Sequence, residues 1–135
     1  MHQRKKSRDS VLKLIYEYLY SHEINEKTLM IMTSGEMPMA EVDYINTVYK
    51  GVIKNFDELK EIIAKYARGF DIDRIYKLDF AALLLAVYEM KYMKDIPLGT
   101  SIAEAVELVK IYSTEKSYSF VNGILSSVYK ELTNK

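Results

Sequence analysis

Four basic side chains near the start of the chain, followed by tyrosines, have the composition of a phosphate-binding surface. Arg4, Lys5, Lys6 and Arg8 give the first eight residues a charge of +4. The other 15 of the 19 basic residues face 19 acidic ones, so the rest of the chain carries −4. Lysine and arginine supply the sequence-independent part of nucleic-acid affinity, and Tyr16 follows on the side of the predicted helix that Lys5 reaches. Nucleic-acid binding is one interpretation of this pattern, and a solubilising terminus is the other.

Phe120 is a second residue whose surroundings suit RNA. The predicted last helix, residues 114–132, places Phe120 at the edge of its apolar face and one turn after Lys116. A ring beside a cation offers a base a stacking surface and a phosphate a contact, although a peripheral core residue would fit the same spacing. Gly123 lies within this helix, where glycine costs about 1 kcal/mol relative to alanine. We therefore expect another helix or a ligand to approach Gly123 closely.

The sequence lacks the residue patterns of enzymes and metal sites. It has 2 histidines, no cysteine and 5 dispersed glycines, which form neither a phosphate-binding loop nor a metal-ligand pattern. We therefore predict no catalytic residue, no metal and no cofactor. The longest apolar run is too short to span a membrane, and no apolar segment of a signal peptide follows the charged start. The lack of cysteine fits a reducing compartment, and we expect a cytoplasmic protein.

Helices must position these residues, because apolar side chains recur at helical spacing and no strand pattern is present. Phe80–Tyr88 is an uninterrupted apolar and aromatic run, which predicts a central helix buried on all sides, with Asp79 and Glu89 near its ends. Around this helix, residues 79–91, we expect helices over residues 7–21, 25–34, 39–54, 55–68, 101–112 and 114–132, and a short helical turn over 71–76.

The predicted organisation is one all-α domain, residues 1–135, of about seven helices, in which residues 1–8 form a basic arm ahead of the first helix. Two helix starts have the spacing of a capping box, one at Asn55 with Glu58 and one at Ser101 with Glu104. The charges of the arm are expected to be solvated and therefore to contribute little to folding.

Five segments, taken in order, match a known family. They are RKKSRDSVLKLIY, DIDRIYKLD, LLLAVYEM, DIP and EAVELVKIYSTEKSYSFVNGIL, and FVNGIL beside EAVEL is the most specific. Together they resemble the bacterial NusB family of transcription antitermination factors over nearly the whole chain. The resemblance implies a non-enzymatic all-α protein built from two helical bundles packed around the central helix. It also implies binding to the boxA element of ribosomal RNA leader transcripts together with NusE, a small-subunit ribosomal protein, within an antitermination complex on RNA polymerase.

The resemblance also implies which residues bind each partner. The RNA-binding residues would be Arg4, Lys5, Lys6, Arg8, Tyr16, Lys116 and Phe120, and the acidic NusE-facing residues would be Asp73, Asp79 and Glu89. The chain departs from the family at Leu84, where arginine is frequent, at Ala103, where asparagine is usual, and at Lys116, where an acid is common. Two other interpretations stay open: a similar domain cut from a ribosomal RNA cytosine methyltransferase, and a homodimeric helical interaction module.

Overall fold

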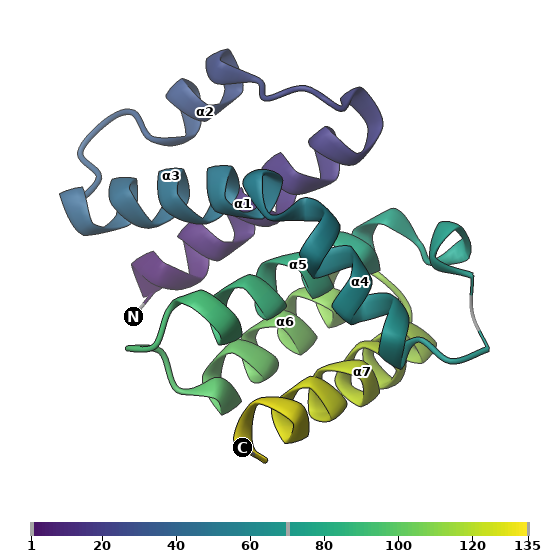
Figure 1. Ribbon diagram of the computed structural model, residues 1–135. Coiled ribbons are helices and arrows are strands. Elements are labelled where there is room, and N and C mark those ends of the chain that lie inside the picture. Colours follow the sequence, from purple (N-terminus) through teal and green to yellow (C-terminus); the bar gives the residue numbers. More distant parts are fainter. Residues whose placement is uncertain (1, 70, 135) are drawn as a thin grey trace.

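The computed structural model describes residues 2–69 and 71–134, and the regular elements of this part of the chain are all helical (Figure 1). In chain order they are α1 His2–Ser21, α2 Glu26–Met32, α3 Met39–Lys54, α4 Phe56–Tyr66, the 3₁₀ turn η1 Ile72–Arg74, α5 Lys77–Tyr92, α6 Leu98–Tyr112 and α7 Glu115–Thr133. The predicted all-α fold is thus confirmed. Met1 of the predicted arm and Lys135 of the predicted domain lie outside the described residues.

Helix α5 is the centre of the fold, as its apolar sequence predicts. All of its residues from Asp79 to Met90 are buried, and it packs against α1, α3, α4, α6 and α7. In Figure 1, α1, α2 and α3 lie on one side of α5, while α6 and α7 lie on the other. The predicted pair of bundles around a central buried helix is confirmed. None of the helices in the described ranges is long and apolar enough to cross a membrane.

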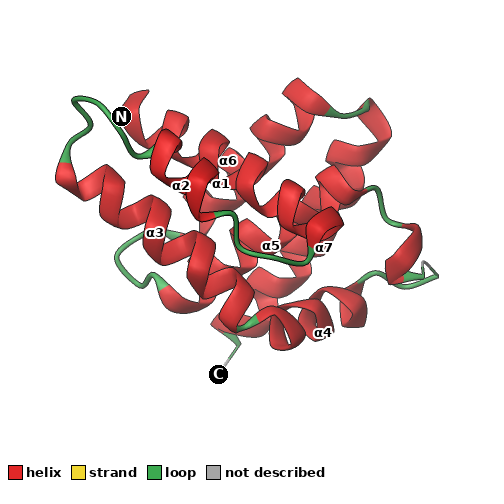
Figure 2. Cartoon of the chain, turned by 90° about the horizontal axis from the view of Figure 1, so that it is seen from above, coloured by secondary structure: helices red, strands yellow, loops and turns green. Residues whose placement is uncertain are grey.

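The connections between helices are short, as Figure 2 shows with the loops in green. Asn25, where the second helix was predicted to start, caps α2: its side chain accepts a hydrogen bond from the backbone N–H of Thr28. Thr114 caps α7 in the same way through the N–H of Ser117. Each cap satisfies a backbone donor that the first helical turn leaves unpaired.

The two predicted capping boxes are wrong. Helix α6 begins at Leu98 after Pro97, one turn before Ser101, and the Ser101 hydroxyl donates to the Glu89 carboxylate 2.8 Å away. Proline suits this position because its missing N–H is not needed at a helix start. Helix α4 begins after Asn55 as expected, but the Asn55 amide donates to the carbonyl oxygen of Gly51 rather than capping the helix.

Helix α3 approaches α5 closely at Gly51. A Cβ atom at this position would lie 2.4 Å from the ring of Tyr88 on α5. The absence of a side chain therefore lets the Tyr88 ring lie directly on the α3 backbone. This contact joins the α1–α3 side of the fold to the central helix.

Candidate nucleic-acid interface

The predicted basic arm is the first part of helix α1 rather than an extension ahead of it. The helix begins at His2, five residues before the predicted start at Ser7. Arg4 Nε donates to Glu41 Oε1 on α3 at 2.9 Å, and Lys5 Nζ lies 3.0 and 2.9 Å from the two carboxylate oxygens of Glu104 on α6. These distant acids pair with the cationic turns. Arg4 is only partly exposed, contrary to the expectation of a solvated charge, whereas Lys5 stays exposed beside its partner as expected.

Arg8 is an interior residue, and so is Glu89. Arg8 is 6% exposed and Glu89 is 1% exposed. Their groups form a two-pronged ion pair, with Arg8 Nε 2.8 Å from Glu89 Oε2 and Arg8 Nη2 3.1 Å from Oε1. Tyr44 and Ser101 also donate to Glu89. The prediction that Arg8 faces RNA and Glu89 faces a protein partner is therefore corrected. The two side chains are buried and hydrogen-bond to each other inside the fold.

The pKa shifts follow from these contacts. Burial lowers the pKa of Arg8, but the hydrogen bond and charge of Glu89 outweigh it and the net pKa is raised. Burial, with the charge of Glu89 added, raises the pKa of the Tyr44 hydroxyl, so Tyr44 donates as a neutral phenol. The Arg4 hydrogen bond holds the pKa of Glu41 below its usual range. The Glu41 contribution to stability is therefore present above the pKa of the unfolded carboxyl, and it is lost as pH falls through the folded value.

The outer face of α1 carries a row of cations and tyrosines. Lys6 is exposed and makes no ion pair with another described residue. Lys13 follows two turns later, where its Nζ pairs with Asp9 at 2.9 Å and lies 5.7 Å from the ring centre of Tyr112 on α6. Tyr16, which the sequence analysis singled out, is 37% exposed. Residues seven positions apart lie on the same side of a helix. The spacing between Lys6 and Lys13 could therefore have predicted that both lie on this face.

Phe120 and Lys116 line one pocket between the start of α7 and the segment that leads into α5. The pocket has a volume of about 710 Å³, and its lining residues are Arg74, Ile75, Tyr76, Asp79, Thr114, Glu115, Lys116, Ser117 and Phe120. Phe120 is half-buried and packs partly against the core. An aromatic ring thus lies in a pocket that two cations, Arg74 and Lys116, also border. Such a pocket can hold a flat ring next to a phosphate.

Asp79 lies in the same pocket, although the sequence analysis assigned it to the protein partner. Its side chain is almost fully buried, at 3% exposed, and its Oδ1 accepts no hydrogen bond from the described residues. A buried acceptor without a donor is destabilising, which makes an external donor favourable here. Asp73, the third predicted partner residue, is exposed on η1. The pocket therefore brings predicted RNA-binding and partner-binding residues together.

The mid-helix Gly123 does not have the predicted close neighbour within the chain. A Cβ atom added there would meet nothing within 4 Å, and the residue is exposed. The fold of the described residues therefore does not need a glycine at this position.

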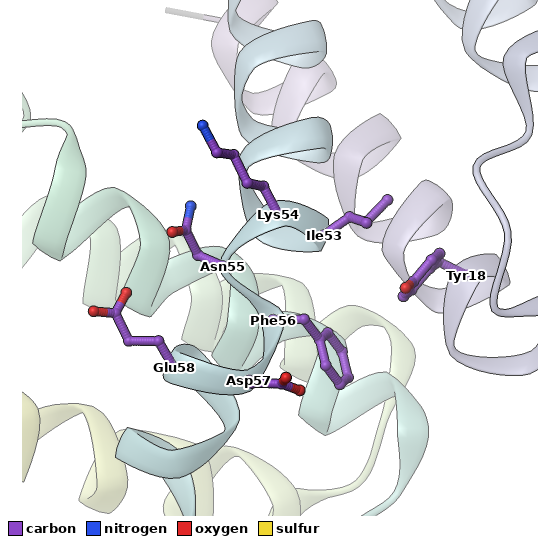
Figure 3. A pocket seen from close by; sticks show the side chains of 7 residues that line it. All are labelled: Tyr18, Ile53, Lys54, Asn55, Phe56, Asp57 and Glu58. Carbon is purple, nitrogen blue, oxygen red and sulfur yellow. The ribbon is translucent and has the colours of Figure 1, made fainter.

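A separate pocket of about 450 Å³ lies at the junction of α3 and α4 (Figure 3). It is lined by Tyr18, Ile53, Lys54, Asn55, Phe56, Asp57 and Glu58, none of which is a predicted site residue. The rings of Tyr18 and Phe56 meet edge to face with centroids 5.9 Å apart, while Lys54 and Glu58 point away from Tyr18.

The described residues contain no group of three or more acidic or histidine side chains that could hold a metal ion.

We expect Glu104 to compete with RNA for Lys5. Its carboxylate binds the Lys5 ammonium group, which a phosphate of RNA would also contact. Replacing Glu104 with glutamine should raise RNA affinity by up to about fivefold, since an exposed ion pair contributes about 0.2–1 kcal/mol. Fluorescence anisotropy with labelled RNA measures the change. Glu107→Gln is the matched control, because it removes the same charge one turn later on α6 from an exposed residue. An equal rise in both variants would mean that net charge, not release of Lys5, is responsible.

Comparisons with known proteins agree on one family. A sequence model of the NusB family matches residues 5–130. The transcription antitermination protein NusB of Acetivibrio thermocellus is 41% identical over 128 residues, which cover 94% of this chain and 88% of that protein. The NusB protein of Listeria monocytogenes is 35% identical, with 95% of this chain and 97% of the relative covered.

Solved structures give the same result. NusB of T. maritima has a TM-score of 0.88 and 29% identity, with 95% of this chain and 91% of that chain covered. A crystal structure of antitermination factors NusB and NusE in complex with double-stranded RNA has a TM-score of 0.84 and 27% identity, and the match covers 97% of this chain and 98% of that chain.

Proposed function

The chain belongs to the NusB family, and from that premise we propose that it is a transcription antitermination factor that binds RNA together with NusE. In this proposal one helical domain binds the boxA element of ribosomal RNA leader transcripts and joins an antitermination complex on RNA polymerase in the cytoplasm. The relatives are antitermination proteins, so the role is one of binding rather than catalysis.

The RNA part of this proposal depends mainly on the pocket that Phe120 lines with Lys116 and Arg74. Single-stranded RNA presents unstacked bases, which bind aromatic rings, and phosphates, which bind nearby cations. The second RNA contact is the outer face of α1, with Lys5, Lys6 and Tyr16. Arg4 can add to it, since 30% of its side chain stays exposed beside Glu41.

The NusE part is supported by the acidic residues at the other side of the pocket. Asp79 has a buried oxygen that a donor from a partner could satisfy, and Asp73 is exposed nearby in the sequence. A hydrogen bond to a charged, buried acceptor contributes more binding free energy than a hydrogen bond that is exposed to water. We infer that NusE contacts the acidic residues Asp73 and Asp79, while RNA contacts the cations and aromatic rings along α1, the pocket and α7.

A binding experiment with purified components tests the proposal. Labelled single-stranded boxA RNA is titrated with the protein at several salt concentrations, alone and with NusE. We expect affinity that falls steeply with salt, because several phosphates release counterions, and that rises when NusE is added. A scrambled RNA of the same composition is the control.

Two results would contradict the proposal. One is RNA affinity that does not change with salt or with NusE. The other is a homodimer in sedimentation that binds no RNA at low salt, which would favour the interaction-module interpretation.

A further inference from the structure

Between the outer face of α1 and the Phe120 pocket lies a group of aromatic and cationic side chains with no role assigned so far. Tyr20 stands one turn after Tyr16, with the two ring centroids 5.2 Å apart and edge to face. The ammonium of Lys77, the first residue of α5, lies 5.3 Å from the ring centre of Tyr20. Tyr76 precedes Lys77 and lines the Phe120 pocket.

We propose that Tyr20, Lys77 and Tyr76 form the middle of one continuous track for single-stranded RNA, running from Tyr16 on α1 to Phe120 on α7. The proposal rests on the proposed function, since it names a path for the same RNA. It joins two RNA-binding elements that are 104 positions apart in the sequence into one surface. Bases would stack on Tyr20 and Tyr76, and Lys77 would contact the phosphate between them.

The exposure of these residues supports a role in binding. Tyr20 is 59% exposed and Tyr76 is 65% exposed. The fold therefore gains little from either ring, and each offers an open face or edge to a ligand. Tyr76 is also the residue before α5 but makes no side-chain cap to that helix. Sequence-tolerant binding of single strands uses this combination of open rings along a cationic groove.

Charge favours RNA over a protein as the occupant. Arg74 and Lys116 border the pocket, Lys77 lies over the Tyr20 ring on the α1 side, and a polyanion along the track would contact these cations. On α1, Asp9 already pairs with Lys13 and accepts a hydrogen bond from the Tyr112 hydroxyl. Two acids also line the pocket, the exposed Glu115 and the buried Asp79. They limit how deep a phosphate can lie there, which places the backbone on the Lys77 side.

Single substitutions on the track test the proposal. Tyr20→Ala and Tyr76→Ala should each weaken RNA binding by about 5- to 150-fold, the effect of losing one stacked base. Tyr20→Phe and Tyr76→Phe should retain most of the affinity, because the ring remains. Thermal unfolding should be unchanged in all four variants. The matched control is Tyr129→Ala, an exposed tyrosine nine residues beyond Phe120 on α7, about 14 Å along the helix.

A charge variant gives an independent measurement. Lys77→Gln should weaken binding and reduce the slope of log affinity against log salt by about 0.7, the value for one phosphate contact on a single strand. Lys130→Gln, an exposed lysine next to the tyrosine control, should leave the slope unchanged.

The outcomes are distinguishable from failure of the proposed function. If the parent protein binds RNA but both alanine variants bind it equally well, the track is wrong and the proposed function stands. If the alanine variants lose NusE binding and keep RNA binding, the surface is a protein interface and the track is wrong. If the parent binds no RNA, the proposed function itself fails and the track with it.

Discussion

Replacing Arg8 with alanine should lower the free energy of unfolding by about 3–5 kcal/mol, because it leaves the buried Glu89 carboxylate without its cation. Glu89 would keep hydrogen bonds from Tyr44 and Ser101, but neither neutralises its charge. A domain of this size has a total stability of about 5–15 kcal/mol, so the variant is expected to be close to unfolding at moderate denaturant. The midpoint of urea unfolding measures the loss.

Two further variants separate the structural role of Arg8 from a direct RNA contact. Lys6→Ala is the control, since Lys6 is exposed and its loss should change stability by less than about 0.5 kcal/mol. Arg8→Lys keeps the charge but cannot form the two parallel hydrogen bonds. We expect Arg8→Lys to be destabilised and to retain RNA affinity once folded. Equal stability of Arg8→Ala and Lys6→Ala would contradict the structural role of the buried ion pair. Loss of RNA affinity in a fully folded Arg8→Lys protein would show that Arg8 contacts RNA.

The Arg8–Glu89 pair also shows where sequence reasoning fails. Sequence reasoning placed Arg8 in a basic arm ahead of the first helix and Glu89 near the end of the central helix, and charged groups in such places are usually solvated. The two residues are 81 positions apart, and Arg4 and Lys5 pair with acids 37 and 99 positions away. No local spacing reports contacts of that range. The start of α1 was predicted too late for the same reason, because acids on α3 and α6 stabilise its first turns.

The helical fold itself could be predicted because its signal is local. The apolar run of Phe80–Tyr88 requires neighbours on every side, and α5 has them. The predicted helix starts at Asn25 and Thr114 also rest on local signals, and both residues cap their helices in the structure. Ser101 shows the limit of this reasoning, since a hydroxyl with capping-box spacing donates instead to a carboxylate on another helix.

For the site, sequence reasoning selected Phe120 and Lys116 but not what surrounds them. Periodicity placed the ring at the edge of an apolar face, where core and ligand roles look alike. The structure adds a pocket and the nearby Asp79 and Arg74, which come from a segment about 40 positions earlier. Tyr76 and Tyr20 of the proposed track were not selected from the sequence, because exposed tyrosines have no distinctive spacing. Their relevance comes from their position between two other elements.

Phe120→Ala should strongly weaken RNA binding and still leave a folded protein. Loss of a stacked base should weaken RNA affinity by about 1–3 kcal/mol. A fully buried phenylalanine would instead cost about 3–5 kcal/mol of stability. Because Phe120 is half-buried at the pocket and packs on the core with only part of its surface, we expect a stability loss below that range.

The urea midpoint and the RNA affinity must be measured on the same Phe120→Ala protein. Val121→Ala is the control for stability, since Val121 is fully buried beside it and lies outside the pocket lining. Val121→Ala should lower the midpoint and leave the affinity of the folded protein unchanged, whereas Phe120→Ala should mainly lower the affinity. Phe120→Tyr should restore binding, because a tyrosine ring also stacks on a base. If Phe120→Ala behaves like Val121→Ala in both measurements, Phe120 is a core residue and RNA does not stack on it.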